Sequence, residues 1–412
     1  MRIGLGIVAL CLLLPACRQQ HDDTAKNAVA SPAPRVMAWP LPTQPGAASP
    51  DLRIAPDGRL LLAWLQADGR QAHRFMFAAA DASGRWLHAP RVIVADQPLF
   101  ANWADTPHIL ATQDGALWAH WLQRTGKGGG TYDVVLARST DQGREWSAGI
   151  KVNDDGTEAE HGFATMWPEG RDRIGIAWLD GRHTTGHGHG GGRMTLRTAT
   201  FDAALARSQE RELDASTCDC CQTNAVVVDG EPVLAWRDRS DGEIRDIVAA
   251  RRKDGVWQEE RVVHADGWYI AGCPVNGPAL AARDGRVLIA WYTGADDTPS
   301  VRIAMANGGA FGAMQQVEAG PAVLGRVAVA LDASQAWVAW LREEAGQQSV
   351  MLARYAPDLS REIDRIEVAT LQARGRASGF PKLVSDGAGA WIVWTDVENG
   401  ATTLHGARIR AE

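Results

Sequence analysis

A pair of apolar segments recurs along the whole chain. In each copy, alternating apolar and small residues lead into a tight turn that contains Gly, and a second apolar run follows and ends on Trp. Residues 107–121 (PHILATQDGALWAHW) and 278–291 (PALAARDGRVLIAW) are two clear examples. Period-two alternation on both sides of a short Gly turn predicts a β-hairpin. The Trp that ends each hairpin occurs seven times, at Trp64, Trp121, Trp178, Trp236, Trp291, Trp340 and Trp394.

Each hairpin is followed by two further strand segments. A polar loop comes after the Trp, and a third apolar strand then follows, for example at residues 134–138 and 350–354. A fourth, more polar strand completes a module of about 50 residues, the repeat length of a propeller blade. The pattern therefore predicts an all-β fold, a seven-bladed β-propeller of four-stranded antiparallel blades. An open β-sandwich would also bury hairpins, but it gives no reason for seven evenly spaced Trp residues.

The two ends of the repeat predict how the ring closes. The last module, from Phe380 onward, supplies only three strands, and residues 35–39 (RVMAW) form an unused strand near the start. We expect this N-terminal strand to pair into the last blade, because closure leaves no free sheet edge. Residues 35–412 would then form one propeller domain.

The segment before the propeller has the order of an export signal. An apolar run spans residues 3–14 and leads to Leu14-Pro15-Ala16-Cys17. The run is too short to cross a bilayer as a helix. Leu-Pro-Ala-Cys resembles the lipobox of bacterial lipoproteins, which implies a signal peptide at residues 1–16, an acylated Cys17 and a flexible tether over residues 17–34. By the same resemblance, Arg18 favours an outer-membrane lipoprotein that faces the periplasm.

Composition and charge narrow the functional classes. The chain has 17 Trp against 7 Phe and 4 Tyr, which fits a repeated structural use of Trp. The net charge of −7 is spread along the chain without blocks, so nucleic acid is not an expected partner.

One turn matches a known motif. Residues 139–146 (STDQGREW) resemble the Asp-box of the sialidase superfamily, Ser-x-Asp-x-Gly-x-x-Trp, and residues 81–86 (DASGRW) and 254–257 (DGVW) look like reduced copies. Turn chemistry explains such a box, since Asp accepts from backbone amides, Gly adopts a positive φ and Trp packs between sheets. The resemblance implies a sialidase-like propeller, with the six blades of sialidases as the structural alternative.

The same resemblance implies what a hydrolase of this kind needs. Sialidases carry an Arg-Ile-Pro at the first inner strand, three arginines that grip a carboxylate, and a Tyr nucleophile polarised by Glu. Here Ala48-Ser49-Pro50 occupies the place of Arg-Ile-Pro, and residues 53–56 (RIAP) lie further along the strand. Tyr292 is the best nucleophile candidate, although no Glu can be assigned to it from spacing.

Blade parity places the chemically distinctive residues on one face. In a four-stranded antiparallel blade, the loops from strand 2 to strand 3 (2–3 loops) and from strand 4 to the next strand 1 (4–1 loops) emerge together, on what we call the site face. The Asp-box turn emerges on the opposite face. The 4–1 loops of blades 4 and 5 contain Cys218, Cys220, Cys221 and Cys273. Blade 3 adds His161 in its 4–1 loop and His183, His187 and His189 in its 2–3 loop.

Three interpretations of the cysteines remain open. An oxidising compartment favours disulfides among the four, including one that staples blade 4 to blade 5. Thiolates with His161 or His183 as co-ligands would instead bind copper or zinc. Buried, unpaired thiols would serve only packing.

Charged residues follow the repeat Trp in blades 3 and 4. Candidates to bind a small anionic ligand, or to pair with neighbouring acids, are Arg182, Arg237, Arg239 and Arg245. The candidates for catalysis are Asp180, Asp238 and Tyr292. The sequence therefore predicts an envelope-anchored propeller that binds a metal or a small anionic ligand on the site face of blades 3 to 5. The alternatives are an exo-glycosidase acting on acidic sugars and a protein-binding scaffold of an envelope complex, whose partner the sequence does not identify.

Overall fold

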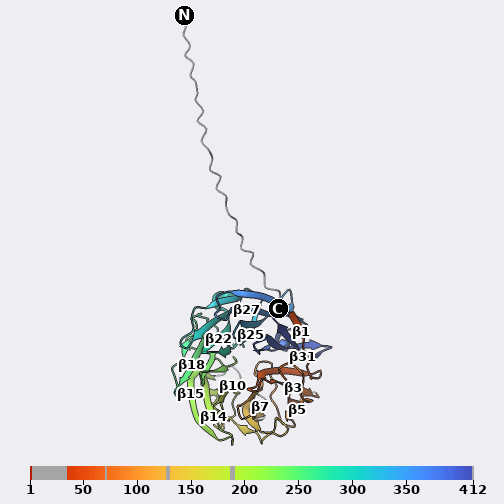
Figure 1. The fold of residues 1–412 in the computed structure, drawn as a ribbon. Coiled ribbons are helices and arrows are strands. Elements are labelled where there is room, and N and C mark those ends of the chain that lie inside the picture. The colour runs from red at the N-terminus through yellow and green to blue at the C-terminus, as the bar shows by residue number, and fades with distance from the viewer. Residues whose placement is uncertain (2–34, 70–71, 127–129, 186–190, 411–412) are drawn as a thin grey trace. The chain divides into compact units, whose positions relative to one another are not determined.

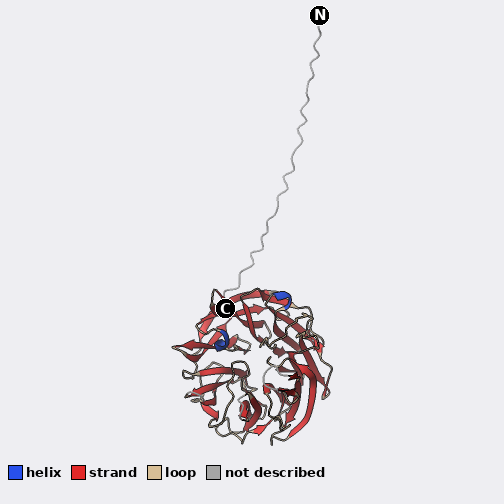
Figure 2. Cartoon of the chain, turned by 180° about the vertical axis from the view of Figure 1, so that it is seen from behind, coloured by secondary structure: helices blue, strands red, loops and turns tan. Residues whose placement is uncertain are grey.

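The structure is a computed structural model that describes Met1 and residues 35–69, 72–126, 130–185 and 191–410. Its strands build seven antiparallel blades around a central axis (Figure 1 and Figure 2). The prediction of a seven-bladed, all-β propeller is therefore confirmed, and the six-bladed alternative does not hold. The predicted signal peptide, Cys17, the tether, His187 and His189 lie outside the described residues.

The blades follow one another along the chain. Blades 1 and 2 consist of β2 (Ala47–Ile54), β3 (Leu60–Asp68), β4 (Ala72–Ala80) and β5 (Arg91–Val94), and of β6 (His108–Ala111), β7 (Leu117–Thr125), β8 (Thr131–Ser139) and β9 (Ile150–Lys151). Blade 3 consists of β10 (His161–Glu169), β11 (Arg173–Asp180), β14 (Met194–Phe201) and β15 (Arg207–Thr217), with β12 (Thr184–Thr185) and β13 (Gly191–Gly192) in its 2–3 loop. Blade 4 consists of β16 (Asn224–Val228), β17 (Glu231–Arg237), β18 (Ile247–Lys253) and two short outer strands, β19 (Val256–Trp257) and β20 (Arg261–Val262).

The remaining blades repeat the same order. Blade 5 consists of β21 (Ala279–Arg283), β22 (Arg286–Thr293), β23 (Ser300–Asn307) and β24 (Gln315–Ala319), and blade 6 of β25 (Val323–Leu331), β26 (Ala336–Glu344), β27 (Gln347–Tyr355) and β28 (Glu362–Leu371). Blade 7 consists of β29 (Lys382–Ser385), β30 (Ala390–Glu398), β31 (Ala401–Arg410) and β1 (Arg35–Ala38). The helices η1 (Ala295–Asp297) and η2 (Gly375–Ser378) are single turns, and no helix in the described part of the chain could cross a membrane.

The N-terminal strand closes the ring as expected. Strand β1 pairs antiparallel with β31, with Arg35 opposite Arg410 and Ala38 opposite Ala407 (Figure 1). The first and last strands of the propeller therefore share one blade, and the sheet of blade 7 is completed by residues from both ends.

The repeat Trp residues form the contacts between blades. Five of them, Trp64, Trp178, Trp236, Trp291 and Trp340, are at most 1% exposed. Burial of one such side chain contributes about 2–3 kcal/mol. The buried indole N–H groups also have hydrogen-bond acceptors. Nε1 of Trp178 donates to Asp180 at 2.8 Å, and Nε1 of Trp236 donates to Asp214 at 2.7 Å.

The Asp-box serves as a turn, as its chemistry predicts. Oδ1 of Asp141 accepts from the backbone amides of Arg144 and Glu145 at 2.9 and 3.1 Å. Gly143 has φ +76°, and a Cβ there would lie 2.2 Å from the ring of Phe77. The box thus fixes the turn between β8 and β9 and the packing of blade 2 on blade 1.

The 4–1 loops are tied to one another around the site face. The bonds run from Ser49 to Asn102 O, from Phe163 N to Asp105, from Thr223 to Phe163 O, from Gly277 N to Gln222, from Arg326 N to Asn276 and from Arg326 to Ser378. Gln222 also reaches from blade 4 to O of Ala104, before blade 2, at 2.9 Å. This collar of side-chain hydrogen bonds holds the cysteine loops in place.

Candidate functional site

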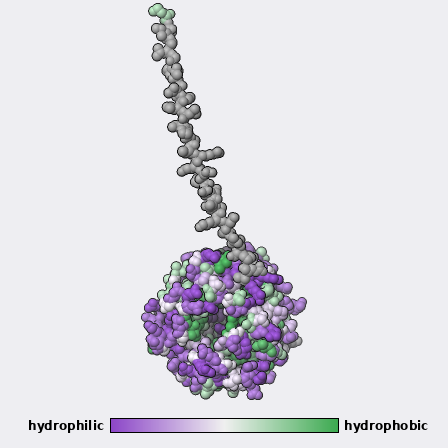
Figure 3. Space-filling view, viewed as in Figure 1, coloured by the Kyte–Doolittle hydropathy of each residue, from purple (hydrophilic) through white to green (hydrophobic). Residues whose placement is uncertain are grey.

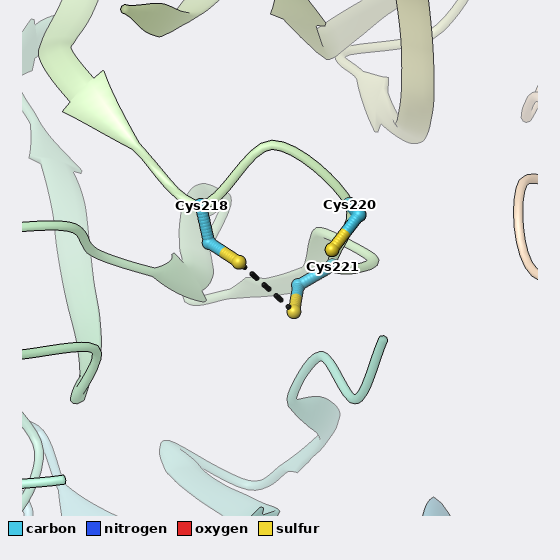
Figure 4. Close-up of side chains that lie close together, drawn as sticks. All are labelled: Cys218, Cys220 and Cys221. Atoms are coloured by element: carbon cyan, nitrogen blue, oxygen red, sulfur yellow. Dashed lines mark hydrogen bonds between the residues drawn. The ribbon is translucent and has the colours of Figure 1, made fainter. Parts of the chain in front are cut away.

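The 4–1 loops of blades 4 and 5 bring the four cysteines together. Cys220 and Cys273 form a disulfide, with Cα atoms 6.0 Å apart. The expected contact between Cys273 and the blade 4 loop is therefore confirmed. Cys218 and Cys221 are free thiols, and their Sγ atoms and that of Cys220 all lie within 4.8 Å of one another (Figure 4).

The two free thiols face each other in a buried pair. Sγ of Cys218 lies 3.3 Å from Sγ of Cys221, and the two residues are 1% and 2% exposed. Nη1 of Arg245 donates to Sγ of Cys218 at 3.2 Å. Burial opposes ionisation of Cys218, but the hydrogen bond from Cys221 and the charges of Arg237 and Arg245 outweigh it and lower the pKa of Cys218 to about 6. The pair therefore holds one thiolate at neutral pH.

The second thiol of the pair stays protonated. Burial and the neighbouring Cys218 raise the pKa of Cys221 well above its usual value. The sequence predicted one set of cysteines in this loop. In the structure Cys220 belongs to the disulfide, whereas Cys218 and Cys221 form a separate dithiol. The spacing Cys218-x-x-Cys221 was the available signal, since two thiols three residues apart commonly act as a pair.

Arg237 is buried, and its donors serve the fold. Nε and Nη2 both donate to O of Asn276, at 3.1 and 2.7 Å. Nη1 donates to O of Arg245 at 2.6 Å, and Nη2 donates to O of Tyr292 at 2.7 Å. The guanidinium lies 4.9 Å from the ring centroid of Trp268. Each guanidinium nitrogen is thus bound to backbone, so Arg237 links blades 4 and 5.

The other candidate arginines pair with acids. Nε of Arg182 lies 2.7 Å from Asp180. Arg239 and Arg245 each place an Nη2 2.7 Å from the carboxylate of Glu243. In the described residues these three guanidinium groups therefore already have a counter-charge on the site face.

His161 belongs to a second group of possible metal ligands, with Asp155 and Asp180. Its Nε2 lies 2.9 Å from Asp155 and 3.7 Å from Asp180. Arg182 contacts both carboxylates, at 3.3 and 2.7 Å, and its single positive charge offsets part of theirs. His183 is exposed. The structure therefore groups His161 with acids, whereas the sequence placed it with the cysteines.

The candidates for catalysis stand in different surroundings. Asp180 is fully buried in its ion pair. Burial and the charge of Asp214 raise the pKa of Asp238 to about 6. Tyr292 packs edge-on against Trp268 with centroids 5.5 Å apart, and burial raises its pKa. Among the described residues no hydrogen bond joins the Tyr292 hydroxyl to an acid, so the Tyr–Glu pair that a sialidase resemblance implies is not formed there.

Charged residues of the inner strands, which the loop pattern does not indicate, also face the centre of the ring. Asp51 and Arg53 of β2 and Lys382 of β29 line the central channel. Their signal in the sequence is a charge placed within an inner strand whose other residues are mostly apolar or small.

The fold defines the class of this protein, a seven-bladed β-propeller. It is similar to the solved structure of a protein of unknown function from Dyadobacter fermentans, with 13% identity over 92% of this chain and 100% of that chain and a TM-score of 0.51. It is also similar to the endosialidase of phage phi92, with 9% identity over 92% of this chain and 69% of that chain and a TM-score of 0.52. Likeness at such identities shows the propeller fold alone. No known protein family and no curated protein sequence matches the chain.

Proposed function

We propose that this propeller binds a soft monovalent metal ion, copper(I), between the thiolates of Cys218 and Cys221. The observation that carries the proposal is the buried pair of free sulfurs 3.3 Å apart. Two metal–sulfur bonds of about 2.3 Å each place the sulfurs at most about 4.6 Å apart. The two sulfurs therefore need to separate only a little to hold one ion between them. Thiolates are soft ligands, and soft ligands select copper(I).

Ligand number and charge favour copper(I) over zinc. Zinc sites take four ligands, and here Cys220 is held in the disulfide while His161 is grouped with acids. Two thiolates around a monovalent ion keep one negative charge, which the nearby guanidinium of Arg245 balances. The same thiolates around a divalent ion would be neutral. The buried guanidinium of Arg237, which pairs with no acid in the described residues, would then lose the nearby negative charge that the sulfurs supply.

Competition between the protein and a chromophoric copper(I) chelator tests the proposal under anaerobic conditions. We expect one copper(I) ion per chain in the wild type and affinity lower on the order of 100-fold or more in Cys218→Ser and in Cys221→Ser, because each variant removes a ligand. The matched control is the double variant Cys220→Ser with Cys273→Ser, which removes two sulfurs but leaves the dithiol intact. It should retain copper.

Two outcomes would overturn the copper(I) site. One is equal copper binding by the wild type and the Cys218→Ser variant. The other is one tightly held zinc ion in protein whose disulfide has been reduced, lost on Cys273→Ser, which would show that all four sulfurs form a zinc site.

We also propose that the chain acts in the cell envelope, anchored in the outer membrane through acylated Cys17 and facing the periplasm. The disulfide between Cys220 and Cys273 supports an oxidising compartment. Cells fed a labelled fatty acid should transfer the label to the wild-type chain and not to Cys17→Ser. Equal labelling of the two chains would contradict the anchor.

A further inference from the structure

A cavity of about 490 Å³ runs through the centre of the propeller. The inner strand of each of the seven blades contributes to its wall. In Figure 3 the ring is hollowed at its centre, and apolar residues are visible inside it. Sites for small molecules commonly enclose about 300–1,000 Å³. The channel is therefore large enough to hold a small organic ligand, and neither Cys218 nor Cys221 lines it.

One side of the channel carries charge. Asp51 and Arg53 come from blade 1, His108 from blade 2 and Lys382 from blade 7. Oδ2 of Asp51 already accepts from Ile109 N at 3.0 Å and from Nε of Arg53 at 3.4 Å. Burial keeps the pKa of His108 well below its usual value, so this histidine is neutral. Two cations and one carboxylate leave this side with one excess positive charge.

Lys382 is the cation without a bound partner. In the described part of the chain its ammonium makes no hydrogen bond and no ion pair, although the charge of Asp51 acts on it. Lys382 is half-buried at the channel wall, and burial lowers its pKa. An anion placed beside it would supply the missing counter-charge.

The opposite side of the channel is apolar. Blades 4 and 5 contribute Val226, Val227, Ala281 and Ala282, which are partly exposed along the channel. Water in contact with this wall is readily displaced by a hydrocarbon group, because apolar surfaces associate in water. A ligand that fits both walls carries one acidic group and an apolar body.

We propose that the central channel binds a small amphipathic monoanion, with its acid group on Lys382 and Arg53 and its hydrocarbon part against blades 4 and 5. This site is separate from the copper(I) site and does not depend on it. The charge asymmetry of the wall sets the specificity, since a neutral or cationic ligand of the same shape leaves Lys382 unpaired.

Calorimetric titration with three ligands of equal chain length tests the charge requirement. The whole chain carrying Cys17→Ser, which cannot be acylated, is titrated with octanoate, octanol and octylamine. We expect octanoate to bind at one site per chain, octanol to bind at least about 10-fold more weakly, and octylamine not to bind. Equal affinity for the three ligands, or no binding of octanoate, would overturn the proposal.

Two charge-matched variants locate the site. Lys382→Met keeps the length of the side chain but removes its charge, and it should weaken octanoate binding about 10-fold while leaving octanol unchanged. Lys253→Met removes the same charge from an exposed position outside the channel and should leave both ligands unchanged. Circular dichroism and thermal unfolding confirm that both variants fold. Equal octanoate affinity in Lys382→Met and Lys253→Met would show that octanoate binds elsewhere.

Discussion

Nη1 of Arg245 donates a hydrogen bond of 3.2 Å to Sγ of Cys218, and the two residues belong to different loops of blade 4. Arg245 precedes β18 in the 2–3 loop, and Cys218 follows blade 3 in the 4–1 loop. The contact thus joins the two kinds of loop that blade parity brings to the site face. The contact also holds the positive charge of Arg245 beside Cys218, the thiol of the pair that ionises at the lower pH.

Removal of that cation should raise the pKa of Cys218. In the metal-free protein, Arg245→Met deletes both the hydrogen bond and a nearby positive charge that hold the pKa at about 6. We expect the pKa to move toward the ordinary value of about 8.5. Thiolate absorbance in the ultraviolet, followed against pH, measures it. Titration curves of wild type and Arg245→Met that coincide would contradict this role of Arg245.

Arg237 should be a stability residue. Its substitution by Met leaves three buried carbonyl groups without their donor, and we expect a loss of about 3 kcal/mol in the free energy of unfolding. Urea unfolding measures the loss. Arg239→Met is the control, because a partly exposed ion pair contributes about 1 kcal/mol or less. Equal losses in the two variants would show that the backbone contacts of Arg237 add little.

Asp105 should make the stability of the fold fall as the pH rises from acidic values toward about 8. Burial raises the pKa of this carboxyl from 3.8 to about 8, although hydrogen bonds from Phe163 N and Tyr132 act against the rise. The folded protein therefore keeps Asp105 neutral while the unfolded chain ionises, so stability falls as the pH rises from about 4 to about 8.

Asp105→Asn removes that dependence, because the amide cannot ionise. Relative to the wild type, the variant should gain on the order of 4 kcal/mol in unfolding free energy between about pH 5 and about pH 8. Chemical unfolding at the two pH values measures the gain. Parallel pH profiles of the two proteins would show that Asp105 is ionised in the fold.

Gly143 should tolerate no side chain. A Cβ there meets the ring of Phe77 at 2.2 Å, and φ is +76°. Gly115 has a similar φ of +84° but nothing within 4 Å of its Cβ position. We expect Gly115→Ala to cost about 1 kcal/mol from backbone strain alone and Gly143→Ala at least about 2 kcal/mol, as measured by urea unfolding. Equal costs would mean that Phe77 moves aside freely.

Sialoside hydrolysis should not depend on Tyr292. Its hydroxyl lacks an acid partner among the described residues, and the nearby Arg237 is bound to backbone. Release of a fluorophore from a sialoside should therefore be the same for the wild type and Tyr292→Phe. Turnover that this substitution abolishes would establish a sialidase-type enzyme.

The architecture could be predicted from the amino-acid pattern. Hairpins that end on Trp recur at a blade-length spacing, and each blade buries its apolar alternation against the next, so local pattern and global fold agree. Ring closure followed from counting, since the last module had three strands and the residues before Ala47 held a fourth. Blade parity also determined which loops meet, and the disulfide between Cys220 and Cys273 bears this out.

The contacts within the loops of the site face could not be predicted in this way, because they depend on the three-dimensional fold. Which of the four sulfurs bond to one another depends on distances within one loop, and the position of His161 depends on the acids of blades 2 and 3 that surround it. The donors of Arg237 go to carbonyl groups as far as 55 residues away in sequence, and no local pattern records such contacts. Lys382, which has no hydrogen-bond or ion-pair partner among the described residues, lines a channel that strands from seven blades surround. That channel is a property of the closed ring and not of any single repeat.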